Sequence, residues 1–255
     1  GPEKPIWAAS AENMVQDLPN VGLPGDRFYG PVTLGEGTWA PYTGSVMAID
    51  PSGRGADETA YAVVKILNGF LFVTDAGGLP GGYSEDTLKR LAMVAKEQEV
   101  NLILVESNFG DGMFSQLLKP ILGKIYRCTC EEIKHSIQKE RRICDTLEPP
   151  MNSHRLIINR SVIEKDFDST KGLPPEKALR YQMMYQMSRI TRDKGALAHD
   201  DRLDVLSMAV GYWAEQMAQD VDTQIQNRKD RKQREELEKF AAHSIGRKPQ
   251  PLKWM

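Results

Sequence analysis

The stretch VMAID (residues 46–50) is an uncharged apolar run that ends in a carboxylate, and the stretch LILVE (residues 102–106) repeats this pattern. Each run predicts a buried strand whose last residue points its side chain out of the core. A buried carboxylate without a partner costs free energy, so two of them at strand tips favour a shared counter-ion. Hard divalent cations such as Mg²⁺ prefer oxygen ligands of this kind. Asp50 and Glu106 are therefore candidate metal ligands.

A third acidic cluster, DDRLD at residues 200–204, opens a predicted late helix that ends near residue 217. Asp201 and Asp204 are three residues apart and share a helix face, and the apolar turn that follows points this face inward. Asp200 fits the helix N-cap or a place beside the ligands. We expect Asp201 and Asp204 to complete a ligand set with the two strand-end acids.

Carboxylates that converge from different elements are what a two-metal phosphodiesterase needs. Two divalent ions about 3.5–4 Å apart can activate water and stabilise the leaving oxygen of a phosphodiester. The sequence therefore predicts a nuclease in which Asp50, Glu106, Asp201 and Asp204 are both metal ligands and catalytic residues. His199 fits either a proton-handling residue or an ordinary surface histidine.

The composition fits one good-sized domain with appendages, because 40% of the 255 residues are hydrophobic and 27% are charged. The net charge of −2 does not indicate a nucleic-acid partner, but a metal-dependent nuclease can keep its basic residues in patches away from an acidic site. The three cysteines form no disulfide framework, which favours a reducing cytoplasm. No apolar run reaches the ~18 residues that span a bilayer and no signal peptide is evident, so we expect no membrane association.

Three segments are predicted along the chain. Residues 1–44 are rich in proline and glycine and read as an interdomain linker, and Gly1-Pro2 resembles the scar of an engineered protease site. We expect residues 45–217 to form the nuclease domain. Residues 218–255 predict a charged helix and a flexible tail. The scar suggests a cloned piece of a longer protein.

Within the predicted nuclease domain, strands and helices alternate. Asn68-Gly69 is the strongest short hairpin signal and joins two strands of an antiparallel meander. Pro149-Pro150 is expected to end a charged helix, and Gly77–Gly82 reads as a loop. The predicted strands are 45–50, 60–67, 70–75, 101–106, 124–129 and 156–159, and the predicted helices are 84–98, 112–122, 133–147 and 174–190.

Three antiparallel strands, a helix and then a parallel strand follow the order of the ribonuclease-H-like fold. This is an α/β fold with a central mixed sheet of five or more strands, flanked by helices. Its first and fourth strands are neighbours, so Asp50 and Glu106 would reach common metal ions. The late helix would cross the sheet and supply the third acid.

Several other segments allow two readings. The Gly53-Arg54-Gly55 turn could let the backbone approach a phosphate, although turns of this composition are common. Lys134, Lys139, Arg141 and Arg142 could follow a DNA backbone or form a solvated helix face. The Gly77–Gly82 loop lacks the Lys-Ser/Thr pair of a phosphate-binding P-loop.

Taken together, the motifs DPSGRGAD (50–57), VESN (105–108) and HDDRLD (199–204) resemble the C-terminal nuclease domain of tailed-phage terminase large subunits, especially those of short-tailed coliphages. The likeness spans roughly residues 40–215. It implies the ribonuclease-H-like fold, two Mg²⁺ or Mn²⁺ ions and endonucleolytic cutting of concatemeric viral DNA during packaging into the capsid. It also implies that Asp50 is the first acid and Glu106 the second, and that the third lies among Asp200, Asp201 and Asp204.

The resemblance also implies partners and a location. The substrate would be double-stranded DNA, and the full-length protein would meet the capsid portal and the terminase small subunit. No Gly-x-x-x-x-Gly-Lys-Ser/Thr motif occurs in this sequence, so we expect the N-terminal packaging ATPase to be absent. The protein would act in the host cell cytoplasm, transiently docked on the procapsid.

Three alternative functions remain open. A Holliday-junction resolvase or integrase of the same fold would share the metal site but prefer another DNA shape. A sugar-kinase-like or actin-like phosphotransferase would need a duplicated fold and a second phosphate loop, which this chain lacks. The chain could also be mainly a portal- or DNA-docking module, with the segment from residue 218 onward meeting the portal.

Overall fold

The computed structural model describes residues 1–33, 38–52, 57–107 and 112–245. The Gly53-Arg54-Gly55 turn, Asn108 and the tail from residue 246 lie outside these ranges. The chain divides into two compact units, Gly1–Trp213 and Ala214–Met255. The predicted domain boundaries after residues 44 and 217 stay predictions.

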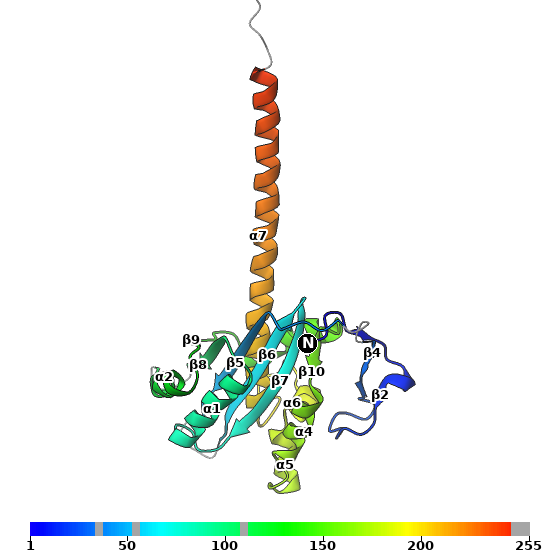
Figure 1. Ribbon diagram of the computed structural model, residues 1–255. Helices are drawn as coiled ribbons and strands as arrows, with labels where there is room; N and C mark the ends of the chain where they lie inside the picture. The colour runs from blue at the N-terminus through cyan, green and yellow to red at the C-terminus, as the bar shows by residue number, and fades with distance from the viewer. Residues whose placement is uncertain (34–37, 53–56, 108–111, 246–255) are drawn as a thin grey trace, which may run out of the picture. The chain divides into compact units, whose positions relative to one another are not determined.

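A six-stranded mixed sheet forms the centre of the first unit, in the order β10-β7-β6-β5-β8-β9 (Figure 1). Strands β5, β6 and β7 are an antiparallel meander, whereas β8, β9 and β10 pair in parallel with β5, β8 and β7. The predicted mixed sheet of five or more strands is confirmed. Its strands are β5 Gly44–Asp50, β6 Thr59–Leu67, β7 Phe70–Leu79, β8 Leu102–Glu106, β9 Thr129–Ile133 and β10 Leu156–Ile158.

The helices alternate with the strands of the sheet as the sequence predicts, but several helix boundaries differ from the predicted ones, as described below. The N-terminal segment forms two small antiparallel ribbons, β1–β4 and β2–β3. The helices are α1 Glu85–Glu97, α2 Met113–Ile125, α3 Lys139–Asn152, α4 Arg160–Asp168, α5 Pro175–Tyr181, α6 Met183–Arg189 and α7 Asp201–Ile245. The ribbons contain β1 Ile6–Trp7, β2 Met14–Val15, β3 Phe28–Tyr29 and β4 Pro31–Thr33, with a 3₁₀ turn at Ala11–Asn13.

Two local sequence signals, a hairpin turn and a helix N-cap, have the structures that the sequence predicts. Asn68 and Gly69 both have positive φ (51° and 78°), as a tight two-residue hairpin turn requires, and they join β6 to β7. Ser84 is the N-cap of α1, and its side chain accepts a hydrogen bond from the Thr87 N–H. Helix α1 then returns the chain so that β8 pairs in parallel with β5 (Figure 1).

The core cluster lies between the sheet and helices α1 and α2. It joins alternate residues of β5 and β8 to the inward face of α1, so the predicted helical spacing is confirmed. Trp213 anchors α7 to the sheet, because its indole N–H donates to the Val64 carbonyl at 2.9 Å. No helix among the residues that the structure describes is long and apolar enough to cross a membrane.

Two predicted boundaries around the sheet were wrong. The strand expected at 124–129 lies instead at Thr129–Ile133, because α2 continues to Ile125 and buries Leu118 and Leu122 in the core. The loop expected at Gly77–Gly82 is partly strand, since β7 runs to Leu79. A Cβ atom at Gly78 would lie 2.0 Å from the Glu58 carboxylate, so a larger residue there would have to displace that side chain.

The predicted charged helix also differs from α3. It begins at Lys139 instead of residue 133, because residues 129–133 pair with β8. It continues through Pro149-Pro150 to Asn152. The two prolines lie near the helix end, and their carbonyls still accept hydrogen bonds from Ser153 and Arg155. Too few helical bonds are lost for these prolines to end the helix.

The helix predicted at 174–190 is two helices, and α4 was not predicted. The extended backbone of Gln182 (φ −80°, ψ 127°) separates α5 from α6. The Asp166 carboxylate of α4 accepts hydrogen bonds from the N–H groups of Met183 and Met184, and so stabilises the start of α6. Downstream, α7 is one continuous helix to Ile245, where a break near residue 217 was expected.

Arg202 ties α7 to two distant parts of the chain, Glu58 just before β6 and Asp166 of α4. Its guanidinium binds both oxygens of Glu58 at 2.6 and 2.9 Å, and its Nη1 lies 3.0 Å from Asp166. Arg202 is 2% exposed and Asp166 is 2% exposed, so these charges are removed from water. Replacing the arginine would leave buried carboxylates without their counter-charge, which is strongly destabilising.

We predict that Arg202→Ala lowers the free energy of unfolding by about 3–5 kcal/mol. Denaturant unfolding followed by circular dichroism measures this loss. Arg90→Ala on the exposed side of α1 is a matched control and should change the stability by less than about 1 kcal/mol. A loss in Arg202→Ala no larger than in the control would contradict the anchoring role.

Candidate metal centre

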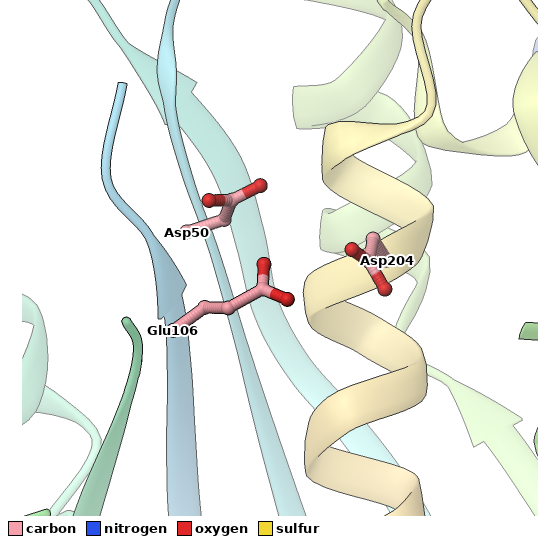
Figure 2. Close-up of side chains that lie close together, drawn as sticks. All are labelled: Asp50, Glu106 and Asp204. Carbon is pink, nitrogen blue, oxygen red and sulfur yellow. The ribbon is translucent and has the colours of Figure 1, made fainter. Parts of the chain in front are cut away.

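Three carboxylates converge at one end of the sheet. One ligand oxygen each from Asp50, Glu106 and Asp204 all lie within 4.8 Å of one another. Figure 2 shows Asp50 and Glu106 at the tips of neighbouring strands, reaching toward Asp204 on helix α7. The three residues are 8%, 7% and 0% exposed. Like charges this close in a buried site repel strongly unless cations balance them.

The sheet register explains why the strand-end acids meet. Ile49 of β5 is opposite Val105 of β8 in the parallel ladder, so the next residues, Asp50 and Glu106, end side by side. Helix α7 buries Leu203 and Leu206 completely, which fixes the helix face that carries Asp204. Three of the four predicted ligands are therefore brought together from three elements.

Two cations of α3 balance the acids. Lys139 Nζ lies 2.8 Å from Asp200, 3.4 Å from Asp201 and 3.2 Å from Asp204. Arg142 Nη2 lies 2.9 Å from Asp204 and 3.7 Å from Glu106. The sequence offered both cations as DNA contacts or as a solvated helix face. The structure turns them toward the acids instead, and their spacing of three residues on one helix is the signal that could have shown it.

Asp201 is not in the group of three carboxylates. Its side chain is 29% exposed and meets only Lys139 among the cations at this centre that the structure describes. Asp200 precedes the helix, and its carbonyl accepts the Asp204 N–H at 2.8 Å. His199 stacks on Tyr181 with ring centroids 4.2 Å apart. The ligand role of Asp201 stays a prediction.

The electrostatics of the centre favour cation binding. Burial raises the pKa of Asp50 to about 8, and the charges of Glu106 and Asp201 add to this effect while Lys139 opposes it. Burial also raises the pKa of Asp201. Burial lowers the pKa of Lys139, but the surrounding aspartates outweigh it and raise that pKa above its ordinary value. Lys139 and Arg142 therefore do not fully offset the cost of ionising these buried acids, and a bound divalent cation would lower that cost.

The donor set fits a hard divalent ion. All three converging side chains offer carboxylate oxygens, the ligand type that Mg²⁺ and Mn²⁺ prefer. Asp204 Oδ2 is buried, and the Lys139 ammonium at 3.2 Å is its cationic partner among the residues described. A buried carboxylate oxygen needs a cation beside it, and a divalent ion that displaced Lys139 would take this place. This group of acids can therefore hold a metal ion.

Comparison with known proteins identifies the domain. Residues 49–156 match the family described as "Terminase Bacteriophage T7, Ribonuclease H-like domain". Residues 49–156 thus match a terminase ribonuclease H-like domain. The chain is 44% identical to the terminase large subunit of Enterobacteria phage T3 over 206 residues. These aligned residues are 81% of this chain and 35% of that relative. The resemblance and the predicted fold class are confirmed, and the chain spans about a third of that curated relative.

Two solved structures are also similar. The nuclease domain of the human cytomegalovirus terminase, soaked with Mn and bound to an inhibitor, matches with 13% identity and a TM-score of 0.46, over 66% of this chain and 82% of that one. The nuclease domain of the large terminase subunit gp2 of bacterial virus Sf6, with manganese and beta-thujaplicinol, matches with 14% identity and a TM-score of 0.44, over 68% and 90%.

The raised pKa of Asp50 predicts a pH-dependent stability. Below pH 3.8 this group is protonated in both states and costs nothing. As the pH rises toward 8, the unfolded chain releases the proton that the folded protein keeps, so stability is lost across this window. In chelator, Asp50→Asn should be more stable than the unmodified protein at pH 9, by on the order of a few kcal/mol.

Denaturant unfolding at pH 9 and at pH 4 measures this effect. The stability that Asp50→Asn gains over the unmodified protein should shrink toward pH 4. Asp86→Asn, at an exposed position of α1, should change the stability by a similar small amount at pH 4 and at pH 9. The same advantage for Asp50→Asn at pH 4 and pH 9 would show that charge at Asp50 is not its cause.

Proposed function

We propose that this chain is a metal-dependent DNA endonuclease that works by two-metal-ion phosphodiester hydrolysis. The observation that supports it best is the buried convergence of Asp50, Glu106 and Asp204 at adjacent strand and helix ends. A bound pair of Mg²⁺ or Mn²⁺ ions would activate water and stabilise the leaving oxygen. Buried acids with perturbed pKa values cluster at functional sites, and Asp50 is such an acid.

The residues have separate roles in this proposal. Asp50 and Glu106 hold the ions from the rigid sheet, and Asp204 holds them from α7. Lys139 and Arg142 keep the acids together before ions bind, and Arg142, only 11% exposed, stays as a fixed positive charge beside them. Asp201 lies outside the group of three and would add at most a secondary ligand once Lys139 moves off. Asp50 must lose its proton to ligate, so affinity for the ions should rise with pH toward 8.

The biological role proposed is cutting of concatemeric viral DNA during packaging. Its support is the 44% identity to a protein named as a terminase large subunit. The full-length protein would work with an ATPase part, the capsid portal and the terminase small subunit, on double-stranded DNA in the host cytoplasm. The segment from residue 218 onward would serve docking, since its described helix exposes apolar Val221 and Ile225 beside a basic run.

Cleavage of supercoiled plasmid tests the activity and the third ligand together. With Mn²⁺ or Mg²⁺, the unmodified domain should nick or linearise the plasmid, and chelator should stop it. Asp50→Asn and Asp204→Asn should each lose about 10²–10³-fold, because each removes a shared ligand. Asp201→Asn should lose less than about tenfold, since its carboxylate lies outside the group of three.

Asp86→Asn is the matched control and should cut normally. Circular dichroism shows whether each variant remains folded. Cutting that continues in chelator or in folded Asp204→Asn would contradict the two-metal proposal. If Asp201→Asn lost as much cleavage activity as Asp204→Asn, both residues would be assigned as metal ligands.

A further inference from the structure

A large groove lies at the sheet edge farthest from β8 and β9, between the N-terminal ribbons and β10. Its volume is about 660 Å³, in the range of protein ligand sites. Aromatic residues of the N-terminal segment, Trp7, Tyr29 and Trp39, form one wall, and Leu156 and Ile158 of β10 form the other. Figure 1 shows β10 as the last strand of the sheet on the side of β2 and β4. The groove is separate from the carboxylate centre.

The β10 wall is an open strand edge. On its inner side the Arg155 carbonyl accepts from the Leu71 N–H and the Asn159 N–H donates to the Val73 carbonyl. The alternation of a parallel ladder therefore directs the main-chain groups of Leu156 and Ile158 away from β7. Within the residues that the structure describes, no hydrogen bond reaches these outward groups. Such an edge is a template for another strand.

The opposite wall contains a hydrogen-bond donor without an acceptor in the described part of the chain. Trp7 Nε1 is buried and donates to no acceptor in the described part of the chain. A buried donor left unpaired is costly, so a small movement of the indole that let it donate to a carbonyl in the groove would be favoured. An extended polypeptide offers carbonyls and N–H groups on both of its edges. It would complement β10 and the indole at once.

The charges of the lining indicate which peptide would fit. None of the described residues lining the groove is acidic, whereas Arg27, His154 and Arg160 are part of it. Arg160 is already paired with Asp17. Arg27 donates to the Asp26 carbonyl at 2.6 Å and forms no ion pair with any residue that the structure describes. A carboxylate of a bound segment would therefore find a counter-charge at Arg27.

We propose that this groove docks an extended apolar segment of a partner protein, which carries an acidic residue at one end and adds to β10 as a further strand. This binding activity lies beyond the proposed nuclease. Aromatic walls can also stack the bases of single-stranded DNA. The open strand edge and the aliphatic residues of β10 favour a peptide over a nucleic acid.

An array of synthetic peptides, about six residues long like a typical strand, tests the proposal. Apolar residues alternate with threonine, and one end carries Glu, Lys or no charge. The Glu series should bind, and the NMR signals of the Leu156 and Ile158 amides and of the Trp7 indole should shift. Backbone N-methylation on one edge of the peptide should weaken binding about tenfold or more, because it removes the pairing donors.

Two variants test the walls separately. Ile158→Pro removes an outward N–H without touching a bond to β7, and should weaken binding about tenfold. Arg27→Glu should reverse the preference from Glu to Lys peptides, whereas Arg90→Glu on α1 should not. Plasmid cleavage by both variants should stay unchanged, so failure of this proposal is distinguishable from failure of the nuclease.

Four outcomes would overturn the proposal. They are equal binding of the N-methylated peptides, no shift of the Leu156 and Ile158 amides at saturating peptide, no binding by any peptide of the array, and tighter binding of oligothymidine than of the Glu series. Because the peptide comparisons use the unmodified protein, they decide the question even if Ile158→Pro misfolds.

Discussion

The structure depends on balancing three buried carboxylates with two cations. Asp50, Glu106 and Asp204 place like charges within 4.8 Å of one another, and neither Lys139 nor Arg142 comes from the elements that carry these acids. Helix α3 must therefore approach both the strand tips and α7. Desolvated charges are costly unless paired, so the position of each of these elements constrains the others. Arg202, with Glu58 and Asp166, fixes α7 in the same way two residues before Asp204.

This arrangement explains how the acids can lie close together and yet, in the proposed function, exchange a cationic side chain for metal ions. Arg142 is almost buried and makes a short contact with Asp204, whereas Lys139 is a third exposed and contacts three aspartates at once. A flexible, partly exposed ammonium is more easily displaced than a buried guanidinium. Burial, together with the charge of Glu106, disfavours the ionised form of Asp50 and raises its pKa, and a divalent cation at the centre would relieve this cost. The groove at β10 is separated from β5 by two strands, so a partner there leaves the centre open.

Much of the fold and part of the site could be predicted from local sequence. The two apolar runs that end in Asp50 and Glu106, the Asn68-Gly69 turn and the Ser84 cap each act over a few residues, and the structure has all of them. The strand Thr129–Ile133 was misplaced because its sequence, TCEEI, is polar and only partly buried at the sheet edge. The break at Gln182 was missed because Asp166, sixteen residues earlier in the chain, provides the hydrogen bonds that start α6. Contacts between residues this far apart in the sequence leave no periodic pattern from which they could be predicted.

The same limit applies to the acids of α7. Asp201 and Asp204 share a helix face, so spacing could not separate their roles, and the crossing of α7 over the sheet brings only Asp204 into the group of three. The most direct test is an anomalous difference map from crystals soaked with Mn²⁺. The account predicts a peak bounded by Asp50, Glu106 and Asp204, with the Lys139 ammonium farther from Asp204 than 3.2 Å. A map with no peak there, or with the ion held elsewhere, would contradict it.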